Sequence, residues 1–142
     1  MTMGRDELSD LTMQAIAATL DRNAEEAARA LSEIGTRGNS RGIYAACCAF
    51  AHLGKVALTK LYGDQAPDLK RGDMWAMDIL QPGADPHDLF AVRFIVAYAN
   101  EDRDQVNALF DASIAAGPED HVCSVTQLLI TAVQLTNTAK DQ

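Results

Sequence analysis

The stretch from Asn39 to Leu61 constrains the fold of this chain more than any other part of the sequence. Between Ile43 and Leu53 it contains no Asp, Glu, Lys or Arg, and His52 is its only basic side chain. A helix with so little polar surface normally lies inside a protein. Because the apolar run is about half the length that a bilayer-spanning helix needs, it predicts a central core helix and no membrane partner.

Segments with helical periodicity lie on both sides of this core helix. Before it, apolar residues recur every three or four positions in two segments, and Asn23 between them is a typical helix N-cap. After it, Pro86, Asp102 and Pro118 are suited to the starts of three more helices. The pattern predicts an all-α fold with about six helices in a single domain, residues 1–142. The predicted helices span about residues 6–21, 23–35, 41–61, 86–100, 102–116 and 118–136. Gly35 ends the second of them, and a turn that contains Gly38 is expected at 36–40.

The two halves of the chain repeat the same apolar pattern at an offset of about 79 residues. When Asn23 is laid on Asp102, apolar positions meet apolar positions in three successive segments without a gap. We therefore predict two similar three-helix units, about 6–61 and 86–137, joined by the connection 62–85. The alternative is that the match arose by chance, because the apolar positions of any two amphipathic helices can be aligned in part. The matched pairs are Ile16 with Ile95, Ala27 with Val106, Leu31 with Phe110, Ile43 with Val122, Ala46 with Val125 and Phe50 with Leu129.

The charge of the chain is acidic and unevenly distributed. The net charge of −8 argues against nucleic acid as a partner, since that binding depends on Lys and Arg neutralising phosphates. Residues 1–62 contain seven Lys or Arg and seven Asp or Glu, whereas residues 63–142 contain five and thirteen. An acidic second half suits a basic protein partner. The alternative is that this charge only keeps the protein soluble.

The cysteines and the N-terminus predict a cytoplasmic protein. The three cysteines are an odd number, and the adjacent Cys47 and Cys48 point in different directions on a helix. This is not the disulfide framework of a small secreted domain, so we expect reduced thiols. The first residues include Asp6 and Glu7 and lack the apolar run of a signal peptide.

Four residues form a weak candidate for a metal site. Cys48 and His52 are four positions apart and share one face of the core helix, and His121 and Cys123 lie at the start of the last helix. Together they are the ligand types of a structural zinc site. The alternative is that they are core thiols and a boundary histidine, because His121 and Cys123 diverge on a helix. We expect no metal and no cofactor.

No catalytic motif is present, and enzyme activity is the least supported class of function. A thiol at Cys47 or Cys48 would be hidden in an apolar helix, which raises its pKa and suppresses its reactivity. Acids adjoin His87 and His121 in two short motifs, as in acid–base sites, but both motifs lie where a helix begins. Capping and the helix dipole account for those acids. We predict no catalytic residue.

A Trp- and Met-containing segment in the connection is the strongest candidate for a binding site. Trp and Met are enriched at the centres of protein interfaces, and acids surround this segment. We expect one or two helical turns within 73–80, capped by Asp73. The alternative is that Trp75 fills the seam between the two units as ordinary core. The candidate partner-binding residues are Met74, Trp75, Met77, Asp78, Ile79 and Leu80.

Two hypotheses about function follow from the sequence. The first is a non-catalytic protein-interaction module, an adaptor, regulator or neutralising partner of a basic protein, which engages its partner through the Trp75 segment and forms a homodimer. The alternative is a regulatory protein that binds a small ligand or a metal in the seam between the two helical units.

Overall fold

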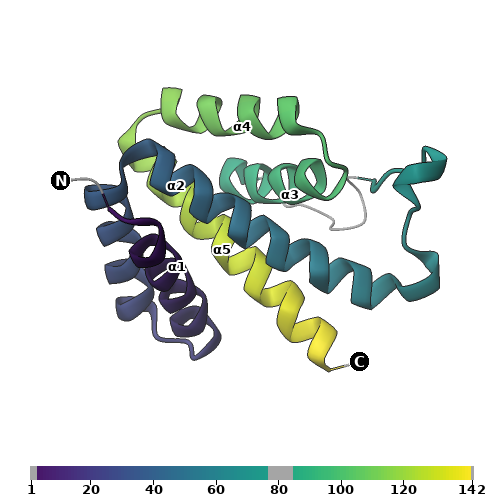
Figure 1. Cartoon of the computed structure of the whole chain (residues 1–142), viewed down its shortest axis with the longest axis horizontal. Coiled ribbons are helices and arrows are strands. Elements are labelled where there is room, and N and C mark those ends of the chain that lie inside the picture. The colour runs from purple at the N-terminus through teal and green to yellow at the C-terminus, as the bar shows by residue number, and fades with distance from the viewer. Residues whose placement is uncertain (1–2, 77–84, 142) are drawn as a thin grey trace.

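The computed structural model describes residues 3–76 and 85–141, and within these residues it is all-helical, with five α-helices and no strand (Figure 1). The predicted all-α class is confirmed. Two short 3-10 turns, η1 (Gly63–Gln65) and η2 (Leu69–Arg71), follow the second helix. The α-helices are α1 (Arg5–Leu20), α2 (Ala24–Tyr62), α3 (Pro86–Ala99), α4 (Arg103–Ala115) and α5 (Pro118–Lys140).

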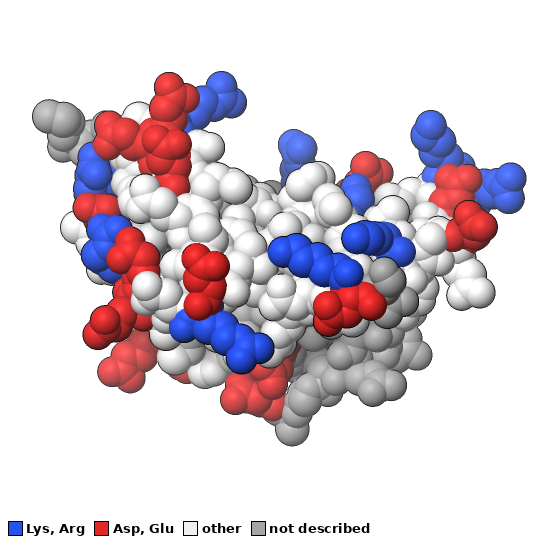
Figure 2. Space-filling view, turned by 90° about the horizontal axis from the view of Figure 1, so that it is seen from below, with Lys and Arg blue, Asp and Glu red and all other residues white. Residues whose placement is uncertain are grey.

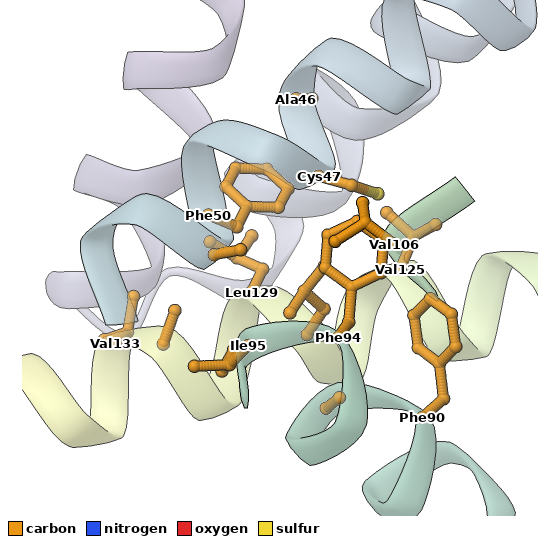
Figure 3. Close-up of a cluster of buried hydrophobic side chains, with 14 of the residues drawn as sticks. Ala46, Cys47, Phe50, Phe90, Phe94, Ile95, Val106, Val125, Leu129 and Val133 are labelled. Atoms are coloured by element: carbon orange, nitrogen blue, oxygen red, sulfur yellow. The ribbon is translucent and has the colours of Figure 1, made fainter. Parts of the chain in front are cut away.

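Two long helices, α2 and α5, cross the centre of the molecule, and the shorter helices pack around them (Figure 1). The helix α1 packs mainly on the first part of α2, α3 contacts both long helices, and α4 contacts α3 and α5. In the core, Phe50 of α2 meets Phe94 and Ile95 of α3 and Leu129 of α5, and all four are buried (Figure 3). The stretch 39–61 is therefore a core helix, as predicted.

A single glycine lets α2 and α3 approach each other closely. A Cβ atom built on Gly54 would lie 3.2 Å from two carbon atoms of the Ile95 side chain. This distance is shorter than ordinary van der Waals contact, so an alanine at position 54 requires Ile95 or one of the helices to move. The spacing of this helix pair thus depends on the missing side chain.

The helix count differs from the predicted six because the second and third predicted helices are one element. The helix α2 runs for 39 residues, and the turn expected at 36–40 is only a kink. At the kink Asn39 has φ 54° and ψ −162°, while its Oδ1 accepts a hydrogen bond from the Arg41 N–H at 3.0 Å. At the C-terminus α5 continues beyond the predicted end near 136, since Ala139 is buried against the rest of the protein.

The turn between α1 and α2 and the turn between α3 and α4 have the same geometry. In each, one residue adopts a left-handed backbone, Arg22 with φ 59° and Glu101 with φ 60°. The next residue, Asn23 or Asp102, caps the following helix with its side chain. The capping bonds run from Glu26 N–H to Asn23 at 3.2 Å and from Gln105 N–H to Asp102 at 3.1 Å.

One helical stretch, Ala24–Gln65, is long and apolar enough to cross a membrane by length and composition alone, among the residues that the structure describes. Half of its most apolar window is buried inside the protein, and the core helix of a soluble protein passes the same test. The stretch is thus weak evidence for a membrane span. The absence of a membrane partner stays a prediction.

The backbone at Asn39 leads to a prediction about stability. Its φ and ψ angles lie in a region that is favourable only for glycine, and strain of this kind costs about 1–3 kcal/mol. The Asn39 side chain caps the second part of α2 by accepting from the Arg41 N–H, and glycine in a capping position costs only a few tenths of a kcal/mol relative to asparagine. Relief of the backbone strain is larger than this loss, so Asn39→Gly should raise the free energy of unfolding by about 1 kcal/mol. Urea denaturation followed by circular dichroism measures this change.

The matched variant Asn39→Ala should have the opposite effect. It keeps the strained backbone and loses the side chain that accepts from Arg41, so we expect the free energy of unfolding to fall by about 1 kcal/mol. Equal destabilisation by glycine and alanine would contradict the strained geometry at this position.

Candidate functional site

A cleft of about 730 Å³ lies between the second part of α2 and the hairpin formed by α3 and α4. Its α2 wall carries Tyr44, Cys48 and His52, which are spaced four residues apart and therefore share one helix face. The opposite wall includes Tyr98 at the end of α3 and the first turns of α4. The complete lining is Tyr44, Cys48, His52, Lys55, Tyr98, Glu101, Asp102, Arg103, Val106 and Asn107.

Hydrogen bonds and ring contacts connect the two walls of the cleft. The Tyr44 hydroxyl donates to Oδ1 of Asn107 at 2.6 Å, and the Tyr44 ring packs edge-on against Phe110 with 5.1 Å between the ring centroids. The Tyr98 hydroxyl lies 3.3 Å from Nδ1 of His52, and these two rings also meet edge-on. The α2 face is therefore held in a defined position relative to the hairpin.

The thiol and the two tyrosine hydroxyls that line the cleft are neutral at pH 7. Burial raises the pKa of Cys48, although a hydrogen bond with Tyr44 and the positive charge of Arg103 act in the opposite direction. Burial also raises the pKa of Tyr44 and of Tyr98. The thiol is therefore not activated as a nucleophile, and the two hydroxyls keep their protons. This chemistry suits binding through hydrogen bonds better than covalent catalysis.

Of the two cysteines outside the cleft, one is buried in the core and the other is exposed. Cys47 is fully buried in the core, and this burial raises the pKa of its thiol far above the ordinary range. Cys123 is exposed on α5. The expectation of a hidden thiol thus fits Cys47, but Cys48 opens onto the cleft.

The four residues of the weak zinc alternative lie in different places. Cys48 and His52 line the cleft, whereas His121 borders a second groove between α2 and α5, and its Nδ1 lies 2.9 Å from the Ser113 Oγ. Cys123 is exposed and lines neither of these two pockets. Among the residues that the structure describes, no three His, Cys, Asp or Glu side chains are grouped to hold a metal ion. The structure therefore does not support the zinc alternative.

The second histidine motif forms a bridge between two helix ends. His87, near the start of α3, places Nε2 3.2 Å from Oδ1 of Asp120 near the start of α5, and its Nδ1 lies 3.4 Å from Oδ1 of Asp85. Asp85 also caps α3 by accepting from the His87 N–H at 2.7 Å. These contacts join the two sequence motifs in which acids adjoin a histidine. The residues that form the contacts do not line the cleft.

Trp75 lies in the core, and its neighbour Met74 is on the surface. The Trp75 side chain is 6% exposed, its backbone exchanges two hydrogen bonds with the Asn100 side chain, and its ring meets Tyr62 edge-on. Met74 is 64% exposed. Residues 73–76 are not helical, contrary to the expected helical turn, and Asp73 instead accepts from the Asp68 N–H at 3.3 Å. The candidate residues Met77, Asp78, Ile79 and Leu80 lie outside the described residues.

Most residues of the cleft were missed by the sequence reasoning. Only Cys48 and His52 were singled out, and then as metal ligands. The four-residue spacing of Tyr44, Cys48 and His52 was a usable signal, because it puts three polar groups on one face of an otherwise apolar helix. The opposite wall could not be found in this way, since nothing local in the sequence indicates which face of α4 lies opposite α2.

Comparison of the chain with protein-family models, with curated proteins and with solved structures gave no match. Its function must therefore be argued from the geometry of its own residues.

The environment of His121 leads to a prediction about pH. The Ser113 hydroxyl donates to the Phe110 carbonyl oxygen at 2.8 Å, so its oxygen accepts from Nδ1 of His121. Burial lowers the pKa of His121 below its ordinary value of 6.5. The unfolded chain then binds the proton more readily than the folded protein, and stability falls as the pH drops through this range. We expect the free energy of unfolding to decrease as the pH is lowered from about 7.5 to about 5.5.

The variant His121→Gln should flatten this pH dependence, because glutamine can donate to Ser113 but does not titrate. His52→Gln is the control and should keep the wild-type dependence, as His52 lies on the exposed side of the cleft. Denaturant titrations at fixed ionic strength measure the effect. An identical pH dependence in wild type and His121→Gln would exclude this role for His121.

Proposed function

We propose that this protein is a non-catalytic regulatory protein that binds a small ligand in the cleft between α2 and the α3–α4 hairpin. The observation that carries the proposal is the cleft itself, about 730 Å³ in volume, where side chains able to form hydrogen bonds converge from both walls. Its size is within the range of small-molecule sites, and its buried base is apolar at Val106. We further propose that the protein is cytoplasmic.

A proposed division into two three-helix units supports this function. Under the 79-residue offset the two interhelical turns correspond residue by residue, with Arg22 on Glu101 and Asn23 on Asp102. The kink at Asn39 then falls on Pro118, the first residue of α5. On this scheme the cleft is the seam between the second part of one unit and the hairpin of the other.

The same correspondence indicates that the fold does not need the polar residues of the cleft. The hairpin residues Tyr98, Arg103 and Asn107 correspond in the first unit to much smaller residues. On the α2 wall, Cys48 and His52 correspond to Gln127 and Thr131, which bond to each other at 3.1 Å. Because the hairpin of the first unit packs without large polar groups at its three corresponding sites, function is the better explanation for Tyr98, Arg103 and Asn107. The hairpin counterparts are Thr19, Ala24 and Ala28.

A fragment screen by two-dimensional NMR tests the proposal. Fragments that bind should shift the amide signals of residues around 44, 48, 52 and 98 more than those elsewhere. The variant His52→Trp should abolish these shifts by filling the exposed side of the cleft. Its matched control is Val56→Trp, one turn further along α2, where the native side chain is 53% exposed and does not line the cleft. Shifts that persist in His52→Trp, or that scatter over the surface, would refute the proposal.

We propose a protein-interaction module, which pairs with a basic protein and forms a homodimer, as the second candidate. The exposed Met74 side chain and the acidic charge of residues 63–142 support it. Figure 2 shows one face of the molecule, on which acidic and basic groups are interspersed, so this face does not present a single acidic block. Trp75 is buried and cannot serve as the exposed anchor in this conformation.

The second candidate is tested at Met74, because Trp75→Ala would remove a core side chain and cost about 3–5 kcal/mol of stability. A basic partner captured at low salt should be lost with Met74→Ser and retained with Met13→Ser, whose native side chain is similarly exposed at 60%. Raising the salt concentration should release the partner from wild type. Equal capture by both variants would exclude the Met74 surface.

A further inference from the structure

Two donor side chains lie one turn apart on the α4 wall of the cleft. Arg103 and Asn107 are four residues apart and therefore share one face of α4, and both line the cleft. A guanidinium and an amide that face the same space are a common arrangement for binding a carboxylate or a phosphate group.

Tyr44 fixes the orientation of the Asn107 amide. The Asn107 Oδ1 accepts from the Tyr44 hydroxyl at 2.6 Å, so the Nδ2 group, with two N–H donors, is the end left for another partner. No hydrogen bond from this Nδ2 to another described residue is present, and the side chain is exposed. A ligand in the cleft can therefore accept hydrogen bonds from it.

Arg103 is close to the same place and is not neutralised there. Its positive charge acts on both Tyr44 and Cys48, lowering the pKa of each against the larger effect of burial. Among the described residues, Arg103 forms no ion pair within 4.0 Å. The guanidinium thus lies beside the α2 wall with its donors available to an anion.

Two carboxylates also line the cleft, and they have different roles. Asp102 is engaged as the cap of α4, since it accepts from the Gln105 N–H at 3.1 Å. Glu101 occupies the left-handed turn position, is exposed and forms no ion pair within 4.0 Å among the described residues. A negative charge at Glu101 weakens the binding of an anion nearby.

We propose that the ligand of this cleft carries an anionic head group, a carboxylate or a phosphate monoester, which Arg103 and the Asn107 amide bind while its apolar body contacts Val106 and Tyr98. This inference rests on the proposed small-ligand function and gives its ligand a chemical class. Figure 3 shows Val106 in contact with the buried core cluster, which provides an apolar base below the head group.

The test measures binding of small aromatic probes by NMR titration of the whole protein. Benzoate and phenyl phosphate represent the two head groups, and benzyl alcohol and benzylammonium are the neutral and cationic controls. We expect at least one anion to bind in the cleft with measurable affinity and both controls to bind more weakly by about tenfold or more, as loss of a charged hydrogen-bond partner predicts. The anion that binds better identifies the head group.

Three variants assign the interaction. Arg103→Gln should weaken binding of the anion by about tenfold, whereas Arg93→Gln, an exposed arginine of α3 outside the cleft, should leave it unchanged. Glu101→Gln should strengthen binding, because it removes a like charge. These variants change exposed side chains, so they should keep the fold, and their NMR spectra verify this.

The outcomes separate this inference from the proposed function. If benzyl alcohol or benzylammonium binds in the cleft as well as the anions do, or if Glu101→Gln weakens binding, the anion assignment is wrong while the cleft remains a binding site. If fragments from the screen bind in the cleft but neither anion does, the assignment is wrong as well. If no compound of any charge binds there, both proposals fail.

Discussion

The burial of the middle of α2 against α3 and α5 is the interaction on which the rest of the structure depends. Ala46, Cys47, Phe50 and Ala51 are completely buried, so a broad face of this helix is removed from water. Apolar burial of this kind is the main favourable contribution to folding. Every other helix is positioned by this burial, either through direct contact with α2 or through contact with α5, which runs alongside α2 (Figure 1).

The same interaction explains which parts of the fold could be predicted. The apolar run from Ile43 to Leu53 predicts a buried helix because it is longer than a typical buried strand. Asn23 and Asp102 predict helix starts because a capping side chain accepts a hydrogen bond from a backbone N–H only three residues further along the chain. The kink at Asn39 was predicted as a full turn, since Gly35 and Gly38 favour a break, but helical geometry continues on both sides of a single strained residue.

The cleft shows where sequence reasoning ends for this protein. The α2 wall is a local pattern and was partly found, through Cys48 and His52. The contact of Tyr44 with Asn107 joins residues 63 positions apart, and it depends on how α4 is placed over α2. The position of Trp75 depends equally on a distant residue, Asn100, which satisfies its backbone groups. Composition identified Trp75 as notable but could not distinguish a core residue from an interface residue.

The close approach at Gly54 has a consequence for how the cleft can vary. Gly54 lies two residues beyond His52 on α2, and Ile95 lies three residues before Tyr98 on α3, so the two helices in close contact also carry part of the cleft lining. A larger side chain at position 54 would have to displace the Ile95 side chain or one of the helices. A displacement of the helices would change the distance between His52 and Tyr98, so a residue that does not line the cleft can alter its dimensions without altering its lining.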